Sequence, residues 1–359
     1  MSPKIGGVDV VRLIVAIAVG VGLLIGPMGA SPVAAQDSSP PAATSAADCP
    51  PVDQAANEAI ARRWHEDALG AGDLSVFDEI LAADFRHDSA TFASPDDLEA
   101  FKAIFAELTL AFPDLSYTID EVISSDDLVA VRWTATGTHE ATFQGIEPTG
   151  IQVTWPGNNL YQFACGEVVA SWSEIDSLGR LQQLGVLPAA DAAAATAADA
   201  TVASDAATPV VSCPVTDPST AEALVLGWWN EVWNGGDLDR LDEILSDRHQ
   251  HHWALGPDTT GADAVKARLA ALHTAFPDLQ ISAHEIVIDG DLVAGRWVAT
   301  GTNSGELMGA APTGATATWQ GINIFRLECG RIAEVWSEMD GIGMQEQLGM
   351  LPAMATPAP

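Results

Sequence analysis

The feature that most constrains this chain is an internal repeat with a constant offset. The segment Phe-Pro-Asp-Leu at 112–115 recurs at 276–279, which is 164 residues later. The same offset holds from Cys49 and Cys213 to Pro188 and Pro352, so neither copy has gained or lost a residue. Solenoid repeats are only about 20–50 residues long. Copies of this greater length predict two tandem domains, each with its own core.

The segments outside the two copies have the composition of tethers and of an export signal. We assign 1–35 to a signal peptide, 36–48 to a tether, 49–188 to domain 1, 189–212 to an Ala/Thr/Asp-rich linker, 213–352 to domain 2 and 353–359 to a tail. Lys4 and Arg12 precede an apolar run from Leu13 to Ile25, which is shorter than the roughly 20 residues of a membrane span. We expect cleavage near Ala35 and a secreted protein without stable membrane insertion; the alternative is an uncleaved anchor.

The charge of the chain is strongly acidic. Its 49 Asp and Glu residues against 15 Lys and Arg residues give a formal net charge of −34. Such a chain repels phosphate backbones and offers no basic stripe, which argues against a nucleic-acid partner.

Four cysteines occupy equivalent places in the two copies. An exported chain meets an oxidising compartment, where an even number of cysteines indicates disulfides. Because a duplicated unit most simply carries its own bridge, we expect Cys49–Cys165 and Cys213–Cys329; cross-copy bridges are the alternative. The spacing contains no CxxC pair of the kind that binds zinc.

The order of elements within each copy predicts an α+β fold. In copy one, helical spacing over 53–71, 73–81 and 95–112 is followed by period-two alternation over 115–123, 128–138, 151–163 and 168–176. Three helices followed by four strands indicate helices packed on one face of a mainly antiparallel sheet.

Strand alternation gathers aromatic and polar residues on particular faces. In the last strand of copy one Trp172, Glu174 and Asp176 share a face, and in the preceding strand Trp155 and Asn159 share one. The equivalents in copy two are Trp336, Glu338, Asp340, Trp319 and Asn323. If these faces point under the helices, they line an aromatic pocket in which burial raises a carboxylate pKa toward neutrality. The alternative is exposed acids at strand ends, with the tryptophans in the core.

An ordered set of motifs carries a family resemblance. These motifs are Phe-Pro-Asp-Leu at 112–115, Val-Ala-Val-Arg-Trp-Thr-Ala-Thr-Gly-Thr-His at 129–139, Gly145, Pro-Thr-Gly at 148–150, Trp-x-Glu-x-Asp at 172–176 and Gln-Leu-Gly at 183–185. The set resembles the SnoaL-like polyketide and ester cyclases of the nuclear transport factor two-like superfamily. The resemblance covers 53–188 and again 217–352.

The resemblance implies a cone-shaped α+β barrel in each copy, with three helices closing a curved sheet around a deep pocket. It also implies an intramolecular aldol condensation without metal or cofactor, in which a last-strand Asp removes a proton next to a carbonyl. Asp176 and Asp340 match that Asp, and His87, His251 and His139 match histidines near it. Copy two has Asn303 at the position of His139, which weakens acid–base chemistry there.

The sequence leaves three functions open. The first is a cofactor-independent acid–base enzyme acting on a small apolar carbonyl compound. The second is a non-catalytic module that binds a small apolar molecule in the same pocket. The third is an intrachain pseudodimer with a structural role, since relatives of this fold often pair through their sheets. The cluster His249, His251 and His252 resembles a metal site, but copy one keeps only His87 there, so we assign no metal.

Overall fold

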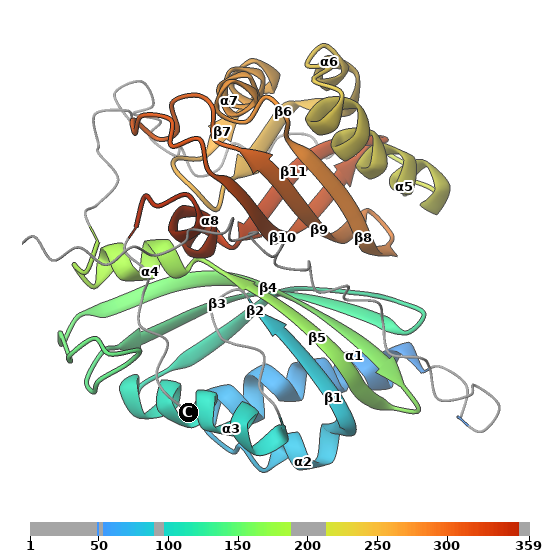
Figure 1. Ribbon diagram of the computed structural model, residues 1–359. Coiled ribbons are helices and arrows are strands. Elements are labelled where there is room, and N and C mark those ends of the chain that lie inside the picture. Colours follow the sequence, from blue (N-terminus) through green and yellow to red (C-terminus); the bar gives the residue numbers. More distant parts are fainter. Residues whose placement is uncertain (1–48, 50–52, 90–96, 188–212, 352–359) are drawn as a thin grey trace, which may run out of the picture. The chain divides into compact units, whose positions relative to one another are not determined.

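The computed structural model (Figure 1) describes Cys49 and residues 53–89, 97–187 and 213–351. The segments assigned to the signal peptide, the tether, the linker and the tail therefore lie outside the described residues. So do residues 50–52, 90–96, 188 and 352 of the two domains. None of the described helices is long and apolar enough to span a membrane.

Domain 1 contains the three helices that the spacing predicts. They are α1 (Gln54–Arg63), continued by the π-helix η1 (Trp64–Gly70), α2 (Val76–Ile80) and α3 (Leu98–Ala111). Asp53 and Asp97 begin α1 and α3 as N-caps, because each carboxylate accepts a hydrogen bond from a backbone N–H three residues on. A fourth helix that the sequence did not predict, α4 (Ser177–Gln183), follows the sheet.

The sheet of domain 1 has five strands in the order β1-β5-β4-β3-β2. They are β1 (Leu81–Ser89), β2 (Ser116–Ser125), β3 (Leu128–Thr138), β4 (Gln152–Ala164) and β5 (Glu167–Ile175). The last four confirm the alternation. Strand β1, which pairs in parallel with β5, was not predicted because its polar and apolar residues do not alternate cleanly.

Domain 2 repeats this arrangement. Its helices are α5 (Pro218–Gly227), η3 (Trp228–Asn234), α6 (Arg240–Ile244), α7 (Ala262–Ala275) and α8 (Gly341–Gln347). Its strands are β6 (Leu245–His252), β7 (Thr259–Thr260), β8 (Gln280–Asp289), β9 (Leu292–Thr302), β10 (Thr316–Glu328) and β11 (Arg331–Met339). The order β7-β6-β11-β10-β9-β8 differs from that of domain 1 only by the short added strand.

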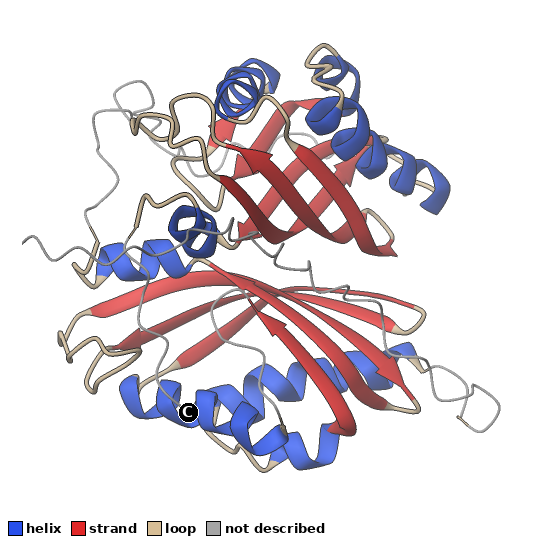
Figure 2. Ribbon diagram, in the orientation of Figure 1, coloured by secondary structure: helices blue, strands red, loops and turns tan. Residues whose placement is uncertain are grey.

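The α+β fold and the tandem duplication are confirmed. In each domain the longer helices gather on one face of the sheet (Figure 2), and a separate apolar core fills the space between them. The implied barrel needs correction, because the strand order of each described sheet runs from one free edge to another without closing.

The two disulfides join the cysteines within each copy, Cys49–Cys165 and Cys213–Cys329. The expected pairing is confirmed. In each domain the bond links the segment before the first helix to the turn between the last two long strands, so it ties the helical layer to the sheet.

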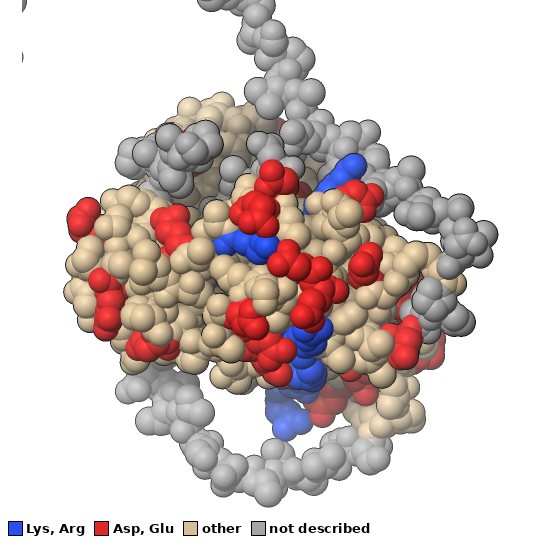
Figure 3. Space-filling model, turned by 90° about the horizontal axis from the view of Figure 1, so that it is seen from below, with Lys and Arg blue, Asp and Glu red and all other residues tan. Residues whose placement is uncertain are grey.

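Acidic side chains are spread over the face of the molecule that Figure 3 shows, most of which is formed by other residues. Figure 3 shows red carboxylates spread over the visible face and outnumbering the blue basic groups. An anion therefore approaches the surface against a repulsive field.

Candidate functional site

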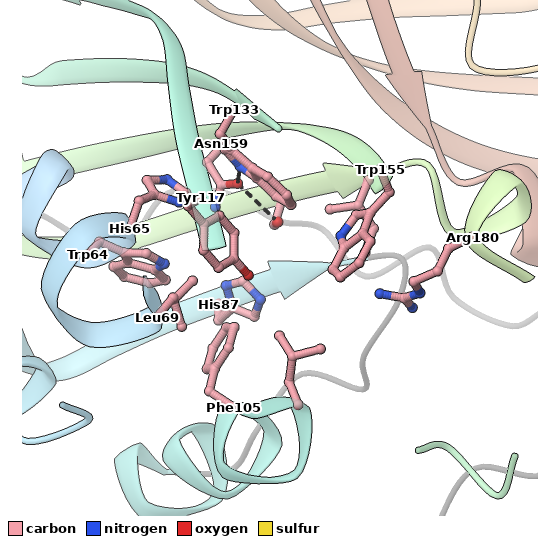
Figure 4. A pocket seen from close by; sticks show the side chains of 13 residues that line it. Trp64, His65, Leu69, His87, Phe105, Tyr117, Trp133, Trp155, Asn159 and Arg180 are labelled. Carbon is pink, nitrogen blue, oxygen red and sulfur yellow. Dashed lines mark hydrogen bonds between the residues drawn. The ribbon is translucent and has the colours of Figure 1, made fainter. Parts of the chain in front are cut away.

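Domain 1 holds an aromatic cavity between its helices and its sheet (Figure 4). The cavity has a volume of about 30 Å³, which is room for about one or two water molecules. Its lining residues are Trp64, His65 and Leu69 from η1, His87 from β1, Phe105 and Leu108 from α3, Tyr117 from β2, Trp133 from β3, Trp155 and Asn159 from β4, Ser173 and Ile175 from β5, and Arg180 from α4. Seven elements of secondary structure besides η1 thus meet at one small space.

The floor of the cavity depends on a close approach between two strands. A Cβ on Gly157 would lie 2.3 Å from the Trp133 ring, so only glycine lets the indole lie across β4. The indole Nε1 then donates a hydrogen bond of 2.6 Å to Asn159 Oδ1. Domain 2 repeats this contact, with a hydrogen bond of 2.8 Å from Trp297 to Asn323. The shared Trp–Asn pair is a structural feature of the fold.

Two histidines face the cavity, and both are neutral near pH 7. A hydrogen bond of 2.8 Å joins His65 Nε2 to the hydroxyl of Tyr161, and another of 2.8 Å joins His87 Nδ1 to Ser171 Oγ. Burial among aromatic rings disfavours the imidazolium and lowers the pKa of each to about 3. These groups can exchange hydrogen bonds with a ligand, but they supply no positive charge.

Arg180 brings a charge to the cavity. Its side chain is only 2% exposed, and its guanidinium lies 5.1 Å from the Phe143 ring centre and 5.4 Å from the Trp155 ring centre. Figure 4 shows the guanidinium beside Trp155, extending toward the other labelled side chains. Burial lowers the pKa of Arg180 to about 10, which leaves it charged at neutral pH.

Some residues that the sequence singled out do line this cavity. Trp155, Asn159 and His87 contribute to its wall, as the alternation of the fourth strand and the resemblance suggested. Their equivalents in domain 2, Trp319 and Asn323, are likewise buried under the helices.

Trp172 and Glu174 do not line the cavity, and the expectation that they share it with Trp155 needs correction. In the antiparallel pairing of β4 with β5, Asn159 lies opposite Ser173, whereas Trp172 lies opposite Leu160. Opposed residues project to the same side of a sheet, so Ser173 faces the cavity and its neighbours face away. Trp172 instead belongs to an apolar cluster with residues of domain 2, such as Ile322 and Ile324.

The equivalent residues of domain 2 follow the same register. Trp336 lies opposite Ile324 and Glu338 opposite Ile322, on the face away from the helices. Glu174 and Glu338 are both buried, and burial raises the pKa of each well above its ordinary value. Burial therefore favours the neutral form of both carboxyls.

Asp176 and Asp340 begin the short helices that follow each sheet. Asp176 accepts a hydrogen bond of 2.7 Å from the backbone N–H of Gly179, and Asp340 accepts one of 2.6 Å from Gly343. Burial raises the pKa of Asp176, and it raises that of Asp340 to about 6. Neither residue is among those that line the domain 1 cavity; whether either is catalytic stays a prediction.

The difference between His139 and Asn303 has a structural explanation. His139 stacks on Phe112, and its Nδ1 accepts a hydrogen bond from the backbone N–H of Thr149. Asn303 Oδ1 accepts the matching hydrogen bond from Thr313, at 2.8 Å. Both side chains present an acceptor that holds the same loop, and His139 does not line the cavity.

The three clustered histidines of β6 have separate local partners. His249 contacts the carbonyl of Ile332, His251 contacts Ser337, and His252 pairs with Asp258 and Glu334. Among the described residues there is no cluster of three or more His, Cys, Asp or Glu side chains that could hold a metal ion.

Sequence reasoning missed His65, Tyr117 and Arg180. They come from a helix, a strand and a second helix that are far apart along the chain. One signal could have revealed them: each has an apolar residue 164 positions later, although most of the lining does not change.

Comparisons with known proteins place the chain in a family. The model of the SnoaL-like polyketide cyclases matches residues 59–184 and again 223–348. Similar solved structures include AclR, a putative hydroxylase from Streptomyces galilaeus, with 29% identity over 38% of this chain and 100% of that one and a TM-score of 0.35. Another is IdmH, a putative polyketide cyclase from Streptomyces antibioticus, with 33% identity over 36% of this chain and 98% of that one and a TM-score of 0.32. No curated protein matches. Because the family model covers more than half of the residues, in two successive copies, the chain belongs to the SnoaL-like polyketide cyclase family.

Proposed function

We propose that domain 1 binds a small, largely apolar carbonyl compound in its aromatic cavity. The observation that carries this proposal is the convergence of Trp64, Trp133 and Trp155 with a few polar groups on one buried space. Apolar lining with few, well-placed polar groups is typical of small-molecule sites. Because the space is narrow, binding requires lining side chains to move.

A calorimetric titration with acetophenone tests whether the pocket binds such a compound. We expect binding to the unmodified protein and its loss in Leu108→Trp, which fills the cavity from α3. Leu110→Trp is the matched control, since Leu110 lies on the same helix and is 69% exposed. Equal affinity of all three proteins would contradict the proposal. Native mass spectrometry of the purified protein would independently reveal a retained ligand.

Cofactor-free acid–base catalysis is a second candidate function. It is supported by Asp176, whose pKa is raised by burial and whose neighbour Arg180 reaches the cavity. A carboxylate with a raised pKa removes protons near neutral pH more effectively. The test is exchange of the methyl protons of acetophenone in D₂O. Catalysis requires protein-dependent exchange that Asp176→Asn slows by about 10²–10⁴-fold, whereas pure binding produces none.

We further propose export of the mature chain and pairing of the two domains as an intrachain pseudodimer. Export is supported by the two disulfides. Pairing is supported by reciprocal contacts: the Arg132 guanidinium lies 4.6 Å from the Trp336 ring centre, and that of Arg296 lies 5.0 Å from the Trp172 ring centre. Asn158 also donates a hydrogen bond of 3.0 Å to the carbonyl of Ile322.

A further inference from the structure

The two domains share most of the aromatic framework around the cavity and differ at four polar positions in and beside it. Three other polar lining residues, His87, Asn159 and Ser173, are retained as His251, Asn323 and Ser337. Trp64, Trp133, Trp155 and Asn159 recur in domain 2 as Trp228, Trp297, Trp319 and Asn323. The polar residues His65, Tyr117, Tyr161 and Arg180 are replaced by Trp229, Ile281, Phe325 and Met344. All four replacements are buried and apolar. The change therefore affects the chemistry of the space and leaves its framework intact.

One of these replacements involves three positions at once. In domain 1 His65 and Tyr161 form a hydrogen bond, and Val131 of β3 is buried in the core of the same domain. In domain 2 the pair has become Trp229 and Phe325, whose rings meet edge-on at 5.6 Å. The residue equivalent to Val131 is Gly295, where a Cβ would lie 2.4 Å from the Trp229 ring. Trp229 thus fills space that a side chain on β9 would otherwise occupy.

Arg180 is the most consequential of the polar residues. Its Nε is buried without a hydrogen-bond partner, and within the described parts of the chain it takes part in none of the ion pairs. Met344 stands at this place in domain 2 and is equally buried. Arg268 of domain 2 differs from Arg180 in position, because it lies on α7, packs over the Trp253 ring and is only partly buried. Burial and nearby positive charge, including that of Arg268, lower the pKa of His251, the equivalent of His87.

The positive charge of Arg180 is not balanced by the cavity. It is the one Lys, Arg, Asp or Glu among the lining residues, and the lining histidines are neutral. The carboxylate of Asp176 attracts Arg180 electrostatically, but the two form no ion pair, and Asp176 Oδ1 accepts a hydrogen bond from the backbone N–H of Gly179. A buried charge without a hydrogen-bonded ion-pair partner is costly, and a carboxylate is the group that a guanidinium pairs with best.

We propose that domain 1 binds a small carboxylate by pairing it with Arg180, and that domain 2 is a filled copy that binds none. The inference rests on the proposed pocket and adds the charge of its ligand. The apolar body of the acid packs among the tryptophans, while His65 and Tyr117 offer hydrogen bonds. The duplication then provides one binding site per chain and a second domain whose core has been completed with apolar side chains.

Calorimetric titrations with matched acids and amides test this proposal. The probes are benzoate against benzamide and, because the cavity is narrow, acetate against acetamide. We expect the full-length protein to bind one acid per chain at least about tenfold more tightly than its amide. Arg180→Met, which installs the residue of domain 2, should abolish the preference, and Arg180→Lys should retain part of it. Arg86→Met is the control, since Arg86 is exposed on β1.

A second variant tests the filled copy. His65→Trp combined with Val131→Gly gives domain 1 two of the residues that domain 2 tolerates, and we expect it to fold and to lose acid binding. An acid preference that survives in Arg180→Met, or two acids bound per chain, would overturn the inference. Equal affinity for benzoate, benzamide and acetophenone would overturn the proposed carboxylate ligand and would still support the proposed pocket. Binding of none of these probes would overturn both.

Discussion

Several residues that the sequence marks as candidates for catalysis also have structural roles as hydrogen-bond acceptors. Asp176 and Asp340 match the acid that the family resemblance marks as catalytic, yet each also caps a helix through a backbone N–H. His139 and Asn303 differ in acidity but offer the same acceptor to the same loop. A residue that recurs between the copies is therefore as informative about folding as about activity.

Asp340 makes a testable contribution to the pH dependence of stability. Its folded-state pKa of about 6 exceeds the ordinary value of 3.8, so the native state holds the proton more tightly. The stability from this group is full below pH 4 and is lost as the pH rises toward 6. Asp340→Asn removes the charge and keeps a good N-cap. We expect the free energy of unfolding of the variant to exceed that of the original protein by about 1–2 kcal/mol at pH 7, because the site is partly exposed, and to equal it at pH 4.

Urea unfolding at both pH values measures this difference. Asp217→Asn is the control, because Asp217 caps α5 and its pKa is lowered to about 2 by hydrogen bonds from Ser219 and Thr220. The ionised Asp217 stabilises the folded state above pH 4, and this contribution is lost in acid. Asp217→Asn should therefore have a lower free energy of unfolding than the original protein at pH 7. If the difference in free energy of unfolding between Asp340→Asn and the original protein were the same at both pH values, the raised pKa of Asp340 would be refuted.

At the scale of elements, the register of the last two long strands organises the site. Pairing Asn159 with Ser173 turns one face of β5 toward the helices and the other toward domain 2. The π-helix η1 then sets Trp64 and His65 side by side above that sheet. Such wide turns are frequent at functional sites.

Gly157 should be intolerant of even the smallest side chain. A Cβ there would meet the Trp133 ring, so Gly157→Ala must shift the indole and weaken its hydrogen bond to Asn159. We expect a loss of about 1–3 kcal/mol in the free energy of unfolding. The double variant with Trp133→Phe frees room for the methyl group, so the added cost of Gly157→Ala should shrink there. Equal costs in both backgrounds would show that the close approach is unimportant.

At the scale of the whole molecule, duplication has produced two domains with one fold and different interiors. Each retains its own disulfide, its own core and the Trp–Asn pair. Domain 1 has the polar residues His65, Tyr117, Tyr161 and Arg180 in and beside its cavity, whereas domain 2 has buried apolar residues at these four positions. The acidic surface of the chain surrounds both.

The intact mass of the exported protein tests its maturation. We expect a chain that begins near Gln36 and gains no mass on alkylation without reductant, because all four cysteines are paired. Reduction should lower stability by about 2–5 kcal/mol per bridge, since each closes a long loop. Alkylation of the unreduced protein would exclude the internal bridges, and a retained N-terminus would exclude cleavage.

The sequence by itself determined the duplication, the α+β class and four strands of each sheet, because these depend on periodicity and on equivalent positions. It favoured a cysteine pairing within each copy, which the structure then confirmed. Alternation also defined the two faces of each strand correctly. Only the tertiary structure decided which face meets the helices: Trp172 and Glu174 point away from the cavity because the β4–β5 register places Ser173 beside Asn159. It alone brought His65, Tyr117 and Arg180 together, since contacts between residues so far apart in the chain arise from packing and not from any local pattern.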